Sequence, residues 1–241
     1  MIHLVSTWSA EYQPLADLTW FANKLPYAKK NGYQAHCIVH GEPKKILWDR
    51  LAFLVAQMEE ATANDWFLFT GTDAFITRPQ YRIEDFIDEG FDFICGLDFR
   101  VVFGDWLLLR NCPANRQIIG DCILAMTWRF ANEQIGFSCL LSGAKTHHDY
   151  LRLNPGPIHT PEHYEKTQAI LNQNPYGLRV KLHGPFSNPA KMLGDLAWIH
   201  DGFHRTVPKF LEWDRNTFML HMGGKPLHFR LGLIPLLLPT L

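Results

Sequence analysis

At 241 residues, with 47% hydrophobic and 20% charged residues, the chain has an ordinary globular composition and enough apolar material for a sizeable core. Its formal net charge of -1 and its lack of long basic runs argue against a dedicated nucleic-acid binder, which needs clustered Lys and Arg. No segment has the composition of a linker, so we expect a single domain over residues 1–241.

The cysteines and the two ends of the chain bear on its environment. The five cysteines are widely spaced and form no CxxC pair, which indicates reduced thiols in a cytoplasmic protein. Residues 1–6 lack the basic and long apolar parts of a secretion signal. The apolar stretch 231–239 is shorter than the ~20 residues that span a bilayer and contains prolines. We therefore expect no transmembrane segment, with peripheral membrane contact left open.

The first third of the chain alternates strand and helix patterns. Strands are predicted at 2–7, 34–39 and 66–69, and helical stripes at 15–25 and 47–58, with a bend at Pro26. This order predicts an α/β fold: a Rossmann-like, mostly parallel central sheet flanked by helices, with right-handed crossovers. In such folds the ligand crevice lies at the carboxyl ends of the strands.

The rest of the chain is less regular. Residues 91–96 and 106–110 are strand candidates, and 118–130 form another helical stripe. The stretch 147–189 is rich in Pro, His and Asn, and we expect loops and short helices there, where an acceptor could bind. A last strand is predicted at 217–220.

Two strand ends carry groups that suit a metal-bound diphosphate. Asp73 follows the strand 66–69, and His221 follows the strand 217–220, ahead of Gly223, Gly224 and Lys225. Carboxylate and imidazole are ligands for Mn²⁺, whereas Mg²⁺ prefers oxygen alone. Paired glycines allow close approach of backbone to phosphate, and a lysine adds a point charge.

Each of these features also has an ordinary structural explanation. An Asp after a strand often forms a turn or caps a helix. A His in an apolar run is often a core residue, and Gly-Gly-Lys-Pro is often a tight turn.

Several short segments, in the same order, resemble a known enzyme family. They are residues 23–33, 48–51, 71–74, 107–111, 132–134, 213–214 and 221–226. They resemble the glycosyltransferases that include yeast α-mannan galactosyl- and mannosyltransferases and plant xyloglucan xylosyltransferases. The resemblance implies a GT-A fold and retaining transfer of a hexose or pentose from a UDP- or GDP-sugar. The acceptor would be a glycan, another hydroxyl compound or a lipid-linked carbohydrate, with Mn²⁺ or Mg²⁺ as cofactor.

The resemblance also implies roles for the residues at the two strand ends. Asp73 corresponds to the second acid of the family's Asp-x-Asp motif, and His221 to its metal-binding histidine. Gly71 stands where the family has the first acid, a departure that weakens the case for a metal. Lys225, with Gly223 and Gly224 beside it, corresponds to the lysine that contacts the donor phosphates.

Other parts of the donor site follow by position. Asn132, Glu133 and Gln134 correspond to a segment near the transferred sugar, with Gln134 beside the anomeric carbon and Glu133 orienting sugar hydroxyls. Without the resemblance, this segment is better explained as a helix start, because Asn is a good N-cap.

Donor contacts are also expected from two further places, the end of the first strand and the ends of later strands. Ser6, Thr7 and Trp8 are expected to line the nucleotide-base pocket, and Thr72 and Asp98 to contact the donor. Residues 1–110 would then form the nucleotide-sugar-binding half, and residues 111–241 the half that binds the acceptor and contributes the metal-binding His.

Two other functions stay open. A nucleotidyltransferase would need a glycine- and lysine-rich loop after the first strand, which residues 6–10 do not supply. A non-catalytic protein that binds nucleotide sugars or carbohydrates is supported by Gly71. The sequence contains no Walker A, GxGxxG or GxSxG motif, which argues against kinases, dehydrogenases and hydrolases.

Overall fold

The computed structural model describes residues 1–40, 46–98, 100–153, 160–183, 190–192, 198–200, 203–205, 218–222 and 227–237. Its strands are β1 (Ile2–Ser9), β2 (Gln34–His40), β3 (Trp66–Gly71), β4 (Ala74–Ile76), β5 (Phe93–Asp98), β6 (Val101–Arg110), β7 (Val180–Leu182), β8 (Ala190–Met192), β9 (Trp198–His200), β10 (Phe203–Arg205) and β11 (Met219–His221). Its helices are α1 (Gln13–Ala16), α2 (Leu25–Asn31), α3 (Ile46–Glu60), α4 (Pro113–Trp128), α5 (Glu133–Ser142), α6 (His147–Leu153), α7 (Pro161–Leu171) and α8 (Leu227–Leu237), with 3₁₀ turns η1 (Ala10–Tyr12) and η4 (Ile83–Phe86) and the π-helical η2 (Asp17–Lys24).

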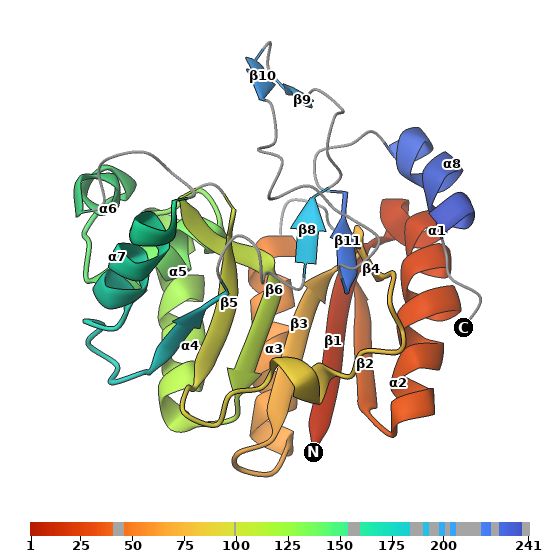
Figure 1. Cartoon of the computed structure of the whole chain (residues 1–241), viewed down its shortest axis with the longest axis horizontal. Helices are drawn as coiled ribbons and strands as arrows, with labels where there is room; N and C mark the ends of the chain where they lie inside the picture. Colours follow the sequence, from red (N-terminus) through yellow and green to blue (C-terminus); the bar gives the residue numbers. More distant parts are fainter. Residues whose placement is uncertain are drawn as a thin grey trace.

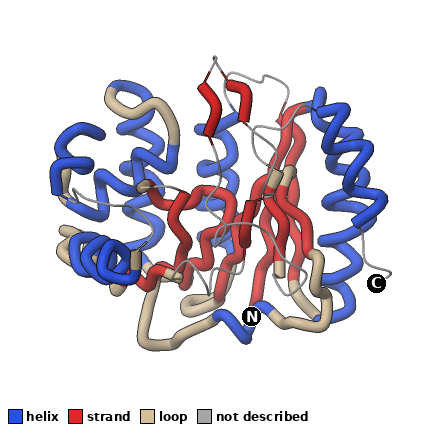
Figure 2. The backbone as a smooth tube through the Cα atoms, turned by 45° about the horizontal axis from the view of Figure 1, so that its top comes forward, coloured by secondary structure: helices blue, strands red, loops and turns tan. Residues whose placement is uncertain are grey.

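The main sheet has six strands in the order β2-β1-β3-β6-β5-β7. Neighbouring strands are parallel except where β6 pairs antiparallel with β3 and β5. Helices cover both faces of this sheet (Figure 2). The predicted α/β fold with a mostly parallel sheet is therefore confirmed, and β6 is its one reversed strand.

Alternating side chains place the sheet between two hydrophobic layers. In β3, Phe67 and Phe69 join the core that contains Leu51 and Leu54 of α3. Trp66 and Leu68 point the other way and join Trp20 and Tyr27 from the helical segment 13–31. This is the period of two that a strand buried on both faces requires.

The helical segment 13–31 runs through α1, η2 and α2 without a break. The change from π- to α-helix comes just before Pro26, where a bend was predicted. Pro26 lies in the first turn of α2 and cannot donate to the preceding turn, so it stands where the hydrogen bonding changes from the π to the α pattern. The segment ends at Gly32, whose φ of 74° is left-handed and suits glycine.

A smaller sheet, in the order β4-β11-β8, lies above the carboxyl ends of the main strands (Figure 1). β11 runs antiparallel to β4, and its register places His221 opposite Ala74. The backbone N–H of Met222 also donates to the carbonyl of Asp73, at 2.9 Å. A segment near residue 220 is thus attached to the turn that follows β3.

The helix α8 packs beside α1 at the same end of the molecule (Figure 1). Leu227, Leu231 and Ile234, spaced as one helix face, join a cluster with Leu15 and Phe75. Among the helices that the structure describes, none has both the length and the apolar character needed to cross a bilayer.

Candidate active site at the carboxyl end of the sheet

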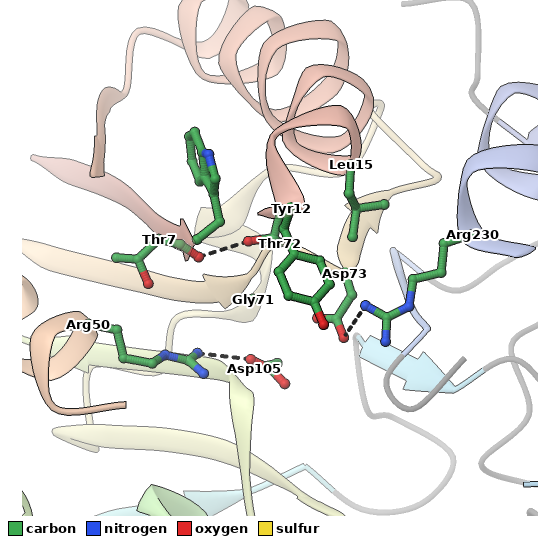
Figure 3. Close-up of a pocket in the computed structure, with 10 residues that line it drawn as sticks. Thr7, Tyr12, Leu15, Arg50, Gly71, Thr72, Asp73, Asp105 and Arg230 are labelled. Carbon is green, nitrogen blue, oxygen red and sulfur yellow. Dashed lines mark hydrogen bonds and ion pairs between the residues drawn. The ribbon is translucent and has the colours of Figure 1, made fainter. Parts of the chain in front are cut away.

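The candidate site lies at the carboxyl ends of β1 and β3. The first half of β6, which runs antiparallel to β3, lies at the same edge of the sheet. A cavity of about 200 Å³ opens there, lined by residues of β1, η1, α1, α3, β3, β6 and α8 and by the turn after β3. Figure 3 shows its polar side chains, with Arg50 and Arg230 extending toward it from different helices. The location is the one expected for a ligand crevice in an open α/β sheet.

The pairing of β4 with β11 brings Asp73 and His221 together. Asp73 immediately precedes β4, and His221 is the last residue of β11. The Nε2 atom of His221 lies 3.4 Å from Oδ1 of Asp73. Two residues separated by 148 positions thus meet, as the sequence analysis predicted, because β4 and β11 are adjacent strands.

A second carboxylate, that of Asp105, lies in the same cluster. The β3–β6 register pairs Phe69 with Leu107, so Gly71 and Asp105 would be opposite each other two residues further on. The Nε2 atom of His221 lies 3.1 Å from Oδ2 of Asp105. One ligand atom each from Asp73, Asp105 and His221 can be chosen within 4.8 Å of one another.

Gly71 is what leaves room for Asp105. A Cβ atom at position 71 would lie 2.4 Å from Oδ1 of Asp105 and 2.7 Å from Oδ1 of Asp73. Any side chain there would displace these carboxylates. A carboxylate from the neighbouring strand thus lies in the space beside Gly71.

The carboxylates and the imidazole shift one another's pKa values. Burial alone would lower the pKa of His221, but Asp73 and Asp105 outweigh it and raise that pKa to about 10. Burial would raise the pKa of Asp105, but Arg50 and His221 hold it well below its usual value. Burial opposes ionisation of Asp73 too, and His221 again lowers its pKa. All three groups are therefore charged near neutral pH.

Arg50 of α3 joins this cluster to the start of α5. Its Nη2 donates to Oδ1 of Asp105 at 2.9 Å, and its Nη1 donates to Oε1 of Glu133 at 3.2 Å. Burial raises the pKa of Glu133, although Arg50 acts in the opposite direction. The other carboxylate oxygen of Glu133 is buried with no hydrogen-bond partner. Arg50 thus fixes the position of Asp105 by a charge-assisted hydrogen bond.

Lys24 lies beneath the turn that carries Asp73. Its side chain is fully buried, and its Nζ donates to the carbonyl of Gly71 at 2.6 Å. Burial lowers the pKa of Lys24 to about 7, although Asp73 and Asp105 act to raise it. Lys24 holds the end of β3 in place through this backbone contact.

The residues predicted for the base pocket separate into two groups. Thr7 and Trp8 line the cavity, as does Thr72, whose hydroxyl donates to the carbonyl of Thr7 at 2.8 Å. Ser6 is fully buried, and its hydroxyl donates to the carbonyl of Thr70 at 3.0 Å. Ser6 therefore supports the joined strands and does not line the cavity.

The residues predicted near the transferred sugar lie at the start of α5. Asn132 is the N-cap of this helix, because its side chain accepts from the N–H of Ile135 at 3.0 Å. Glu133 reaches the cluster through Arg50, and neither it nor Gln134 lines the cavity. Gln134 packs near Gly104 of β6.

The remaining predictions lie at or beyond the limits of the described structure. Asp98 ends β5, at the same end of the sheet as Gly71. Gly223, Gly224 and Lys225, the predicted phosphate-binding residues, lie outside the described residues.

The sequence analysis missed four residues of the site: Lys24, Arg50, Asp105 and Arg230. Asp105 could have been noticed as a lone acid between apolar residues in a strand pattern that extends back to Val101. Arg50 stands next to Leu51 in the apolar stripe of α3. A single charged residue inside a buried strand is the signal for Asp105, whereas Arg50 follows Asp49 in an amphipathic helix and offers no such signal.

The chemistry of the donor set fits a divalent cation. Two carboxylates and an imidazole are ligands that Mn²⁺ accepts, and the oxygen donors also suit Mg²⁺. Neither nitrogen of His221 makes a hydrogen bond, although Nε2 lies within ion-pair distance of both acids. The three side chains converge on a shared point without satisfying one another's hydrogen bonds, which is the arrangement expected of ligands around a common ion.

The comparisons with known proteins bear on the fold. No protein-family model and no curated protein matches the sequence. The structure is similar to that of a glycosyltransferase involved in the glycosylation of the major capsid of PBCV-1, with a TM-score of 0.60, 11% identity and coverage of 98% of each chain. The chain therefore has a GT-A-like fold, while the family suggested by the sequence segments stays a hypothesis.

Two structures of Drosophila β1,4-galactosyltransferase 7 also match, at lower similarity. The complex with xylobiose has a TM-score of 0.33 and 11% identity, over 51% of this chain and 52% of that one. A mutant in complex with manganese, UDP-Gal and xylobiose has a TM-score of 0.35 and 10% identity, over 75% and 64%. Similarities at these TM-scores add nothing to the fold assignment.

Proposed function

We propose that the protein is a glycosyltransferase that moves a sugar from a nucleotide-diphosphate donor to a hydroxyl acceptor. The observation that carries this proposal is the cluster of Asp73, Asp105 and His221 at the carboxyl edge of a GT-A-like sheet. The cavity beside the cluster is bordered by the end of β1, where such a sheet binds a nucleotide.

The proposed cofactor is Mn²⁺ or Mg²⁺, held by Asp73, Asp105 and His221. A divalent cation in this position supplies a Lewis acid that neutralises the charge gained by the leaving diphosphate. Arg50 keeps Asp105 turned toward the cluster, and Lys24 keeps the end of β3 in place. Metal ligands bind in their deprotonated forms, so His221 would have to lose its proton to hold a cation together with the two acids.

The proposed transfer retains the configuration of the sugar, and the sugar is a hexose or a pentose. An inverting displacement needs a general base beside the acceptor hydroxyl. The two carboxylates that line the described cavity, Asp73 and Asp105, are both engaged by cationic side chains. Among the described residues neither is free to act as that base, and retention itself is proposed from the resemblance of the sequence segments. A glycan or another hydroxyl compound is the proposed acceptor.

The charge balance of the cluster also favours a second candidate, a protein that binds nucleotide sugars without transferring them. His221, Arg50 and Arg230 already neutralise Asp73 and Asp105 in part. An anionic ligand could therefore be held by these side chains alone.

Calorimetry with UDP- and GDP-sugars, with Mn²⁺ or with EDTA, separates the two candidates when combined with an assay of donor hydrolysis. A glycosyltransferase is expected to bind its donor more tightly with Mn²⁺ and to hydrolyse it slowly without acceptor. Binding that is indifferent to the metal, with no hydrolysis, would support the binding protein instead. If neither sugar nucleotide binds under any condition, the proposed function is wrong.

A further inference from the structure

Arg230 is a buried cation at the wall of the cavity. It is 8% exposed, and it comes from α8, which is anchored by Leu227, Leu231 and Ile234. Arg230 shares the helix face of these residues, so anchoring them directs its side chain toward the site. Figure 3 shows its guanidinium pointing at Asp73, beside the ring of Tyr12.

Among the residues that the structure describes, the contacts of Arg230 leave its buried Nε donor without a partner. Its Nη1 lies 3.4 Å from Oδ2 of Asp73, an ion pair that is long for a charge-assisted hydrogen bond. Its Nε is buried with no hydrogen-bond partner. Its guanidinium carbon lies 6.0 Å from the centre of the Tyr12 ring. A guanidinium has five N–H donors, and leaving a buried one such as Nε without a partner is unfavourable.

Arg230 lies next to the candidate metal site because it contacts Asp73. Arg230 and His221 contact different oxygens of that carboxylate. Oδ1 of Asp73 faces His221, whereas Oδ2 faces Arg230. A ligand with two linked phosphoryl groups could therefore reach the three-residue cluster with one group and the guanidinium with the other. The planar fork of Arg binds phosphate oxygens in pairs, which a lysine cannot do.

We propose that Arg230 is an anion-binding residue of this cavity and that its guanidinium binds a phosphoryl group of a diphosphate. The assignment of that diphosphate to a sugar nucleotide rests on the proposed function. The anion-binding role itself depends only on the position of Arg230, its long ion pair with Asp73 and its unpartnered Nε. α8 would then contribute to ligand binding as well as to packing.

The test compares the wild type with Arg230→Gln and Arg230→Lys. His228→Gln is the matched control, because His228 lies on the same helix and is exposed. Each protein is titrated with inorganic pyrophosphate, UDP and GDP, and with uridine and guanosine as probes that lack phosphate. Circular dichroism and thermal unfolding check that each variant is folded.

We expect Arg230→Gln to weaken binding of pyrophosphate and of the nucleoside diphosphate that binds the wild type at least tenfold. Arg230→Lys should weaken it less, because the charge remains while the fork is lost. Nucleoside binding and the His228→Gln control should be unchanged. If both folded Arg230 variants bind pyrophosphate and nucleoside diphosphate as the wild type does, the proposal is wrong.

The outcome is separable from that of the proposed function. Loss of pyrophosphate binding in Arg230→Gln, in a protein that never turns over a sugar nucleotide, supports the anion-binding role and contradicts the glycosyltransferase. Unchanged pyrophosphate binding in Arg230→Gln, in a protein whose wild type transfers sugar, contradicts the anion-binding role alone. A wild type that binds neither pyrophosphate nor nucleoside diphosphate contradicts the role of Arg230 as well.

Discussion

The carboxylate of Asp105 occupies the space that a side chain at Gly71 would need, since a Cβ atom there would lie 2.4 Å from its Oδ1. The two positions face each other across the β3–β6 pair when the observed register is extended by two residues. The Asp105 carboxylate therefore lies where the side chain of an acid at position 71 would have to begin.

This relationship predicts that the acid can be moved between the two strands. Asp105→Ala should weaken Mn²⁺ binding at least tenfold, because one of three ligands is lost. Gly71→Asp alone should also weaken it, since the new side chain collides with Asp105 and Asp73. The double variant Gly71→Asp with Asp105→Ala should recover part of the affinity. Titrations followed by electron paramagnetic resonance of free Mn²⁺ measure each affinity.

Gly71→Ala is the informative control for that exchange. It adds only a methyl group and no ligand, so it should weaken Mn²⁺ binding by pushing the Asp105 carboxylate aside. An affinity equal to that of the wild type in both Gly71→Ala and Asp105→Ala would show that Asp105 is not a ligand.

Arg50 is predicted to matter for stability as well as for the site. Arg50→Met leaves the largely buried carboxylates of Asp105 and Glu133 without their shared partner. Removing one member of a buried ionic group costs about 3 to 5 kcal/mol, so the free energy of unfolding in urea should fall by that amount. Arg50→Lys should cost less.

The control for Arg50 is an ion pair nearer the surface, Lys181 with Asp88. Lys181→Met keeps the aliphatic stem and should change the free energy of unfolding by less than ~1 kcal/mol. Equal effects of Arg50→Met and Lys181→Met would contradict a structural role for the buried network.

The free energy of unfolding at mildly acidic pH should depend on His183, which is not part of the Asp73, Asp105 and His221 cluster. Burial lowers the pKa of His183 to about 4, and the ring packs edge-on against Phe86. The unfolded chain takes up this proton below about pH 6.5, whereas the folded chain does so only near pH 4. The contribution of neutral, buried His183 to the free energy of unfolding is therefore fully present above pH 6.5. It is lost as the pH falls toward 4, and the total loss is about 3 kcal/mol.

Urea unfolding of the wild type and of His183→Gln at pH 7 and pH 5 tests this shift. The loss of stability between the two pH values should be about 2 kcal/mol smaller in the variant, because glutamine does not titrate. His228→Gln, at an exposed position of α8, should follow the wild type. If His183→Gln lost as much free energy of unfolding between pH 7 and pH 5 as the wild type, the lowered pKa of His183 would be contradicted.

Sequence patterns predicted the fold class because the main strand and helix signals of the first third of the chain agree with the structure. The apolar runs of β1 and β3 and the stripe of α3 have the periods of buried strands and an amphipathic helix. Asp73 and His221 stand out in the sequence because each lies close to the end of an apolar strand pattern, where α/β sheets bind ligands.

Asp105 and Arg50 were missed because their roles depend on strand pairing and on helix packing, not on nearby residues. The reversal of β6 is invisible in its own sequence, yet it alone brings Asp105 to the carboxyl end of β3. Arg230 was overlooked because it precedes an apolar stretch that was considered only as a membrane-contact segment. In each case the missing information was which elements are neighbours in space.

The central claim is that Asp73, Asp105 and His221 hold one divalent cation together. The most direct measurement is a crystal soaked with Mn²⁺ and UDP or GDP, with diffraction recorded near the manganese absorption edge. We predict one anomalous peak per chain, in contact with all three side chains. A peak elsewhere, or no peak between these residues at saturating Mn²⁺ and nucleotide, would contradict the claim.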